Sequence, residues 1–239
     1  APAAPALIGV MNADFNGDGK ADPAVYNETD GSWTIKQASG APAAMAVQAL
    51  GSAGWAPAAA DYDGDGLADQ AIYQRASGVW AVRLSSGREV SIAFGGAGWA
   101  AAAADYDGDG LADPVVYNGE TGEWKVKLSG AGYAEATMSA KLGGAGWVAA
   151  PADYDGDGLA DPAVYKTADG SWTILASGSD YAAVALSKLL GGADWEAVPG
   201  DYDGDGLADP AVRNAAGTGI WKVLLSSDGY RPLVVSMGL

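Results

Sequence analysis

One acidic nine-residue loop occurs five times along this chain, at an almost constant interval. The first copy, residues 14–22, reads DFNGDGKAD, and the four later copies all read DYDGDGLAD. Successive copies begin 47, 44, 48 and 48 residues apart, at Asp14, Asp61, Asp105, Asp153 and Asp201. Repeats of this length are typical of propellers and of other arrays of one small unit. The spacing therefore predicts that all 239 residues belong to five copies of one structural unit.

Each unit has the sequence pattern of four short strands. An apolar run follows the loop, as in residues 113–117, DPVVY, where proline suits the first residue of a strand. The next run alternates apolar and polar residues, as in residues 80–84, WAVRL, which indicates a strand with one buried face. A third run ends at a Gly-Gly or Gly-Ser turn, and a fourth begins at a tryptophan and leads into the next loop.

We expect an all-β fold, a five-bladed β-propeller with four antiparallel strands in each blade and one calcium-binding loop per blade. The whole chain, 1–239, would form one domain, with blades at 6–52, 53–96, 97–144, 145–192 and 193–239. Residues 7–13 would supply a first strand, and residues 236–239 resemble the Leu-Gly end of a fourth strand. Closure into a ring protects the sheet edges. An open solenoid is the alternative, but it would need atypical end units, and the end units here diverge only mildly.

The loop presents oxygen atoms in an order that suits Ca²⁺. Side chains at positions 1, 3 and 5, a backbone carbonyl at position 7 and an acid at position 9 supply ligands for an ion that accepts six to eight oxygens. Valine or isoleucine at position 12 excludes an EF-hand, and Mg²⁺ suits the loop less because it dehydrates reluctantly. The predicted ligands, with Lys20 and the leucines acting through their carbonyls, are Asp14, Asn16, Asp18, Lys20, Asp22, Asp61, Asp63, Asp65, Leu67, Asp69, Asp105, Asp107, Asp109, Leu111, Asp113, Asp153, Asp155, Asp157, Leu159, Asp161, Asp201, Asp203, Asp205, Leu207 and Asp209.

Electrostatic repulsion disfavours an acidic turn without a metal. Two carboxylates about 5 Å apart repel by about 3 kcal/mol at an effective dielectric constant near 20, and each later loop gathers four acids. We therefore expect five bound Ca²⁺ ions, which would change the net charge from -17 to -7.

The acidity of the chain is concentrated in these loops. They hold 19 of the 30 acidic residues, which leaves 11 acids against 13 Lys and Arg elsewhere. We expect no nucleic-acid partner, because no basic stripe remains to neutralise phosphates. The apolar stretch at 41–60 is broken by proline and glycine and recurs before every later loop, so we expect no membrane insertion. The chain has no Cys and no His, which excludes disulfides, thiolate metal sites and histidine-based catalysis.

The loops followed by DPAVY resemble the FG-GAP/VCBS family of calcium-binding β-propeller repeats, which includes integrin α-chain propellers, fungal lectins and secreted bacterial proteins. The resemblance covers essentially the whole chain. It implies calcium in the loop between the first and second strands of each blade, with ligand roles for Asp14, Asn16, Asp18, Asp22 and their equivalents. Integrin-like propellers have seven blades, so the resemblance does not extend to the number of blades or to a particular function.

The nine tryptophans form two repeated sets. Trp33, Trp80, Trp124, Trp172 and Trp221 lie on the alternating strand, where we expect them to form core between blades. Trp55, Trp99, Trp147 and Trp195 follow the glycine turn, and they are either further core or a repeated surface for stacking sugars. Repeated sugar sites would combine weak affinities into useful avidity.

We expect a non-enzymatic, calcium-stabilised binding scaffold, with glycans as one ligand class. A protein-interaction or adhesion platform is the alternative, and so is a designed consensus repeat without a natural ligand, because copies two to five are nearly identical. A polysaccharide-active enzyme is least favoured, since equivalent acids around a ring do not make one asymmetric active site. The lack of cysteine and the demand for calcium favour a secreted or cell-surface location, and the Ala/Pro-rich opening at residues 1–6 suits a mature chain or a fragment.

Overall fold

The computed structural model describes residues 7–9, 13–36, 45–47, 49–138, 141–186, 188–216 and 218–236. The expectations for residues 1–6 and for the Leu-Gly end at 237–239 lie outside these ranges. Among the described residues, no helix has the length and apolar character that crossing a membrane requires.

The described chain forms five antiparallel sheets of four strands, and in each sheet the strands pair in the order of the sequence. The first sheet contains β1 (Leu7–Gly9), β2 (Ala24–Asn27), β3 (Trp33–Ile35) and β4 (Met45–Val47). The second contains β5 (Trp55–Pro57), β6 (Gln70–Gln74), β7 (Val79–Arg83) and β8 (Glu89–Ala93). The third contains β9 (Ala100–Ala101), β10 (Val115–Tyr117), β11 (Trp124–Leu128) and β12 (Ala134–Thr137). The fourth contains β13 (Trp147–Ala149), β14 (Ala163–Lys166), β15 (Trp172–Ala176) and β16 (Ala182–Ala185), with the short 3₁₀ turn η1 (Ser177–Ser179) between β15 and β16. The fifth contains β17 (Trp195–Ala197), β18 (Ala211–Asn214), β19 (Ile220–Leu225) and β20 (Arg231–Ser236).

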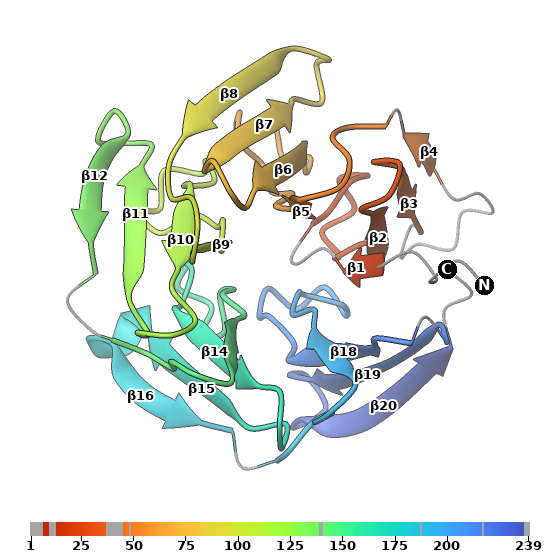
Figure 1. Cartoon of the computed structure of the whole chain (residues 1–239). Helices are drawn as coiled ribbons and strands as arrows, with labels where there is room; N and C mark the ends of the chain where they lie inside the picture. The colour runs from red at the N-terminus through yellow and green to blue at the C-terminus, as the bar shows by residue number, and fades with distance from the viewer. Residues whose placement is uncertain are drawn as a thin grey trace.

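The sheets are arranged radially around a central axis, as in a propeller (Figure 1). The first strand of a sheet lies nearest the axis and the fourth lies at the rim, as β5 and β8 show. The predicted all-β propeller with antiparallel four-stranded blades is thus confirmed. The prediction of a five-bladed propeller is corrected, because four sheets are full blades and the first, whose described strands have three or four residues, is a smaller sheet.

The second strand of each sheet is buried on both faces. In β10 every residue is buried, because this strand lies inside its own sheet and also packs against the neighbouring sheet. In β7 the pattern alternates, with Trp80 and Val82 buried and the residues between them half-buried. Period-two alternation in the sequence therefore predicts the buried face of the third strand correctly.

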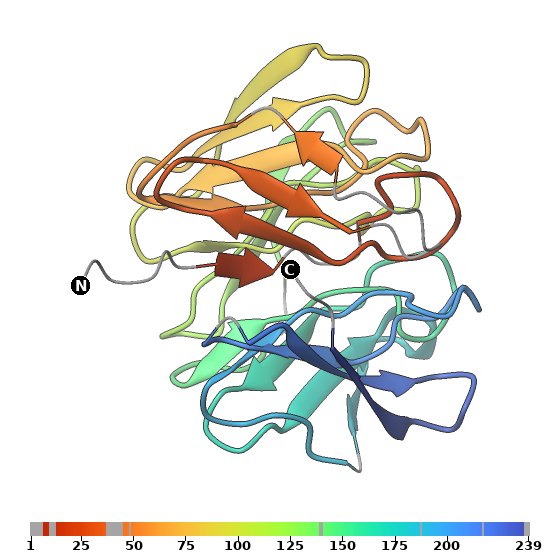
Figure 2. The ribbon, with the colours of Figure 1, turned by 90° about the vertical axis from the view of Figure 1, so that its right-hand side faces the viewer.

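The rim strands are the exposed edge of the molecule (Figure 2). All residues of β12 and of β16 are exposed. Their outer edges have no strand partner among the described residues.

The five acidic loops join the sheets into a closed ring. The N–H of the alanine at position 8 donates to the carbonyl of the aspartate at position 1 of the preceding loop, as from Ala112 to Asp61 at 2.6 Å. Equivalent bonds run from Ala68 to Asp14, from Ala160 to Asp105, from Ala208 to Asp153 and from Ala21 to Asp201, at 2.6 to 2.7 Å. The last of these connects the first loop to the fifth, and β1 contacts both β5 and β17. The prediction of a closed ring is therefore confirmed over the open solenoid.

Candidate metal centres

Four loops bring three carboxylates together. In each, one oxygen from the aspartates at positions 1, 3 and 9 lies within 4.8 Å of the other two. The groups are Asp61, Asp63 and Asp69; Asp105, Asp107 and Asp113; Asp153, Asp155 and Asp161; and Asp201, Asp203 and Asp209. Position 9 is buried in all four groups.

The aspartate at position 1 is held by the backbone of its own loop. Asp61 accepts the N–H of Gly64 at Oδ1, at 2.7 Å, and the N–H of Gly66 at Oδ2, at 2.8 Å. Both glycines have positive φ, 76° and 84°, a backbone conformation that other residues adopt only with strain. Two glycines are thus needed to fold the backbone around one carboxylate.

The aspartate at position 9 anchors the loop to the core. Asp69 accepts the N–H of Tyr62 at Oδ2, at 2.8 Å, and the N–H of Ser85 at Oδ1, at 2.7 Å. Burial, with a smaller contribution from the charges of Asp63 and Asp61, raises the pKa of Asp69 to about 6. Burial raises the pKa of Asp209 to about 6 as well. The ionised form of such a buried carboxylate becomes favourable when a cation neutralises its charge.

The aspartate at position 5 is not a member of the group of three carboxylates, and its predicted role as a ligand stays a prediction. Asp65 accepts the N–H of Leu67 at 2.9 Å and the hydroxyl of Ser85, and this hydroxyl bond lowers the pKa of Asp65. In the third loop, the hydroxyl of Ser129 donates the equivalent hydrogen bond to Oδ2 of Asp109 at 2.9 Å. The sequence analysis does not predict these serine contacts. The signal was present, because serine stands five residues after the strand tryptophan in four units and Ala38 takes its place in the first.

The side chain at position 7 contacts the neighbouring loop. A Cβ at Gly64 would lie 3.1 Å from Cδ2 of Leu111, so each leucine covers the glycine at position 4 of the preceding loop. The predicted ligand role of the position-7 carbonyl stays a prediction.

The first loop differs from the other four, and the expected number of five calcium ions is corrected: four loops form a group of carboxylates that could hold a metal ion. Asn16 stands where the later copies have aspartate. Its Nδ2 donates to Oδ1 of Asp22 at 3.1 Å, while its Oδ1 accepts the N–H of Asp18 at 2.9 Å. The amide thus supplies to Asp22 the positive partner that a cation would supply elsewhere. The loop has one carboxylate fewer and less need for a metal.

The four carboxylate groups fit a hard divalent cation. They offer only oxygen donors, and Ca²⁺ accepts carboxylates in mono- or bidentate mode together with carbonyls and water. Aspartates at positions 1, 3 and 9 would hold the ion, and its charge would offset their mutual repulsion.

Calcium dependence should vary with pH in a defined direction. Between about pH 4, the usual pKa of an unfolded aspartate, and the folded pKa of about 6 at Asp69 and Asp209, the metal-free fold holds protons that the unfolded chain has lost. The metal-free protein therefore loses stability as pH rises through this window. Bound calcium requires the ionised carboxylate, so its affinity increases over the same window. The gap in Tm between calcium and EDTA should widen from pH 4.5 to pH 7; an equal gap at both would contradict these pKa values.

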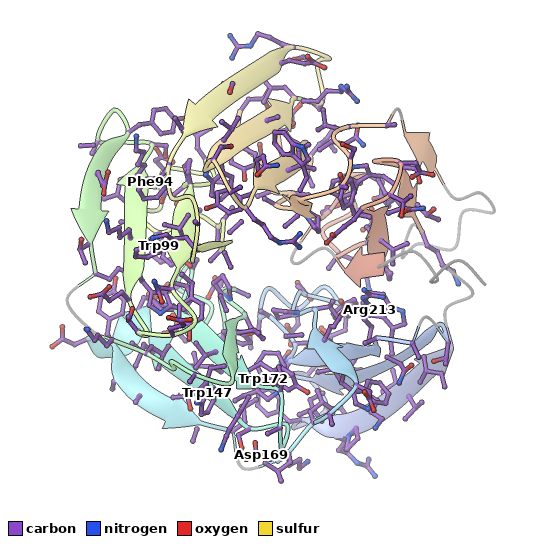
Figure 3. The ribbon with its side chains drawn as sticks, viewed as in Figure 1. Phe94, Trp99, Trp147, Asp169, Trp172 and Arg213 are labelled. Atoms are coloured by element: carbon purple, nitrogen blue, oxygen red, sulfur yellow. The ribbon has the colours of Figure 1, made fainter. Side chains whose placement is uncertain are left out.

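The two sets of tryptophans have different environments. The strand set is core, as predicted, with Trp80 and Trp124 fully buried. The other set is half-buried, and Figure 3 shows Trp99 and Trp147 with the core residue Trp172. The ammonium of Lys125 lies 5.1 Å from the ring centre of Trp99, and that of Lys222 lies 3.9 Å from the ring centre of Trp195. A ligand that stacks on these rings would have to displace or bind the lysine.

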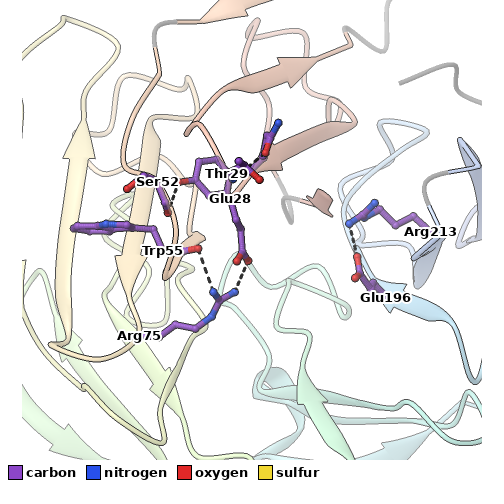
Figure 4. A network of polar contacts seen from close by, with 9 residues as sticks. Glu28, Thr29, Ser52, Trp55, Arg75, Glu196 and Arg213 are labelled. Atoms are coloured by element: carbon purple, nitrogen blue, oxygen red, sulfur yellow. Dashed lines mark hydrogen bonds and ion pairs between the residues drawn. The ribbon is translucent and has the colours of Figure 1, made fainter. Parts of the chain in front are cut away.

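Two ion pairs break the repetition near the inner strands (Figure 4). Arg75, after β6, pairs with Glu28, after β2, at 2.8 Å and so links the first and second sheets. Arg213 on β18 pairs with Glu196 on β17. Arg213 stands where other sheets have a buried tyrosine such as Tyr165, and burial lowers its pKa.

Residues 13–72 match the model of the FG-GAP-like repeat family. This segment contains the first two acidic loops and the strands between them. Residues 13–72 thus carry an FG-GAP-like repeat. Each repeat comprises one acidic loop and the strands that follow it, and the propeller arrangement agrees with the family resemblance in the sequence. Among curated protein sequences, none matches this chain.

Solved structures with a similar fold share little sequence with this chain. A streptogramin B lyase has a TM-score of 0.50 and 8% identity, with 99% of this chain and 71% of that chain covered. A catalytically inactive virginiamycin B lyase from Staphylococcus aureus with quinupristin has a TM-score of 0.48 and 7% identity, with 99% and 72% covered. A protein from Lactobacillus plantarum has a TM-score of 0.47 and 12% identity, with 95% and 70% covered. The likeness concerns the fold alone.

Proposed function

We propose that this protein is a calcium-stabilised propeller that acts as a non-enzymatic binding scaffold outside the cell, with the small sheet β1–β4 serving as its fifth blade. The observation that carries the proposal is the repeated group of three aspartates, with the third member buried in each of four loops. Burying a carboxylate beside two others is costly without a cation. An extracellular location would supply calcium at the concentrations that such modules use.

The number of calcium ions should depend on residue 16. Asn16→Asp gives the first loop the acidic sequence of the other copies and removes the amide that donates to Asp22. We expect the calcium stoichiometry, measured by isothermal titration calorimetry, to rise from four to five ions per chain. Asp107→Asn is the matched control, because it places asparagine at the same position of the third loop, and it should lower the count to three. A count unaffected by either substitution would contradict this assignment.

Glycans are the ligand class that we favour for the scaffold. Trp99, Trp147 and Trp195 recur at equivalent positions, half-buried, each with a lysine ammonium 3.9 to 5.7 Å from its ring centre. An aromatic face supports stacking of a sugar ring, and the ammonium can donate hydrogen bonds to hydroxyl or carboxylate oxygens. Trp55 would be the fourth site.

A glycan array probed with the calcium-loaded protein tests this assignment. We expect binding that weakens by several-fold in Trp99→Ala, with the thermal melt showing that the variant is folded. Absence of binding to any glycan would instead favour a protein partner. The exposed apolar residues at the rim, Val184, Leu189, Leu233 and Val234, support that alternative.

A further inference from the structure

Each of the four loops with a carboxylate group has a residue from the next loop lying over its position-4 glycine, and one of these residues is a cation. Leu111 lies over the loop of Asp61, and the equivalent leucines lie over the next two loops. Over the fifth loop lies Lys20, because the ring closes from the first loop onto the fifth. A Cβ at Gly204 would lie 3.1 Å from Cε and 3.5 Å from Nζ of Lys20.

The ammonium of Lys20 is fixed on the backbone of the loop that carries Asp201, Asp203 and Asp209. Its Nζ donates to the carbonyl oxygen of Asp203 at 2.7 Å, in a partly buried position. Asp203 is itself a member of the group with Asp201 and Asp209. One residue further on, the N–H of Ala21 donates to the carbonyl of Asp201 at 2.6 Å. The first loop is therefore attached to the backbone of two residues of this group.

The positive charge of Lys20 has opposite effects on the stability of the calcium-free loop and on its affinity for calcium. An ammonium near empty carboxylates reduces their repulsion, which stabilises the calcium-free loop. The same ammonium repels an arriving divalent cation, which lowers its affinity. The first loop, whose amide already supports Asp22, lies under Leu67 and not under a cation.

We propose that Lys20 supplies a fixed positive charge where the sheet β17–β20 meets the sheet β1–β4. This charge makes the site of Asp201, Asp203 and Asp209 the weakest calcium site of the ring. This inference rests on the proposed calcium function. Its consequence is that the contact that closes the ring depends least on calcium, so the ring stays closed when the other loops have lost their ions.

Lys20→Met tests the proposal, because methionine keeps the length of the stem and removes the charge. In a calorimetric calcium titration we expect three tight sites and one site about tenfold weaker in the original chain, and four similar sites in the variant. Asp203→Asn should remove the weak class alone. In EDTA the variant should melt at a lower temperature than the original chain, whereas in calcium the two should melt alike.

The matched control is Leu159→Lys, which places an ammonium over the third loop. It should weaken one of the tight sites by a similar factor. A weak site that persists in Lys20→Met, or a loss of Tm that is equal in calcium and in EDTA, would overturn the proposal and leave calcium binding intact. Absence of all calcium binding would overturn the proposed function, and this inference with it.

Discussion

Removal of calcium should lower the melting temperature of this protein by about 15 °C. When free calcium is ten times the dissociation constant of the three tight sites, each of these sites adds about 1.4 kcal/mol to the free energy of unfolding. The tenfold weaker site adds about 0.4 kcal/mol, so the four sites together add about 5 kcal/mol. That is comparable to the whole stability of a typical domain, and for a chain of this size 1 kcal/mol corresponds to about 2–4 °C. Circular dichroism melts in 1 mM calcium and in excess EDTA measure the effect.

Two controls separate calcium binding from a general effect of ions. Excess magnesium should restore little of the lost stability, because Mg²⁺ retains its water and demands octahedral geometry. Asp113→Asn, which changes a fully buried member of one carboxylate group, should reduce the calcium-dependent part of the shift by about a quarter. Identical melting curves in calcium and in EDTA would exclude structural calcium.

Trp124→Ala should destabilise the protein by about 4 kcal/mol, or about 10 °C in Tm. The side chain is fully buried in the core of its sheet and packs against Tyr117, with ring centres 4.8 Å apart. Truncation leaves a cavity whose walls are β-strands that cannot collapse into it. Urea unfolding at a fixed calcium concentration gives the free-energy difference.

Trp99→Ala is the comparison within the same unit. Trp99 is half-buried, with the ammonium of Lys125 over its ring, so truncation should cost well under half as much as at Trp124. Equal costs at the two positions would mean that both sets of tryptophans are core, and the case for sugar stacking at Trp99 would be lost.

Much of the fold could be predicted because it is local and repeated. The alternation at Trp80 and Val82 indicates which face of β7 is buried, and the structure agrees. The glycines and aspartates of each loop act within nine residues, so their spacing alone indicates a turn around oxygen ligands. The smaller size of the first sheet was not predicted, since residues 24–35 keep the same apolar pattern as the later copies.

The candidate metal sites were predicted less completely. The spacing predicts a ligand role for the aspartate at position 5, and this stays a prediction. It does not predict that Asp65 accepts the hydroxyl of Ser85, 20 residues further along the chain. The sequence predicts Asn16 as a ligand like the aspartates of the later copies, because asparagine supplies an oxygen in many calcium loops. Only the structure shows its amide donating to Asp22.

The repeated unit, its β-strands, the position of the acidic loops and the oxygen atoms that they offer can all be derived from the amino-acid pattern. Which carboxylates lie together, and which residue lies over each loop, depends on how the sheets pack in three dimensions. The physical reason is that a loop is completed by its neighbour in the ring, and for the fifth loop that neighbour is the first. The contact of Lys20 with Asp203 joins residues 183 positions apart, and no local pattern in the chain encodes a contact that exists only when the ring closes.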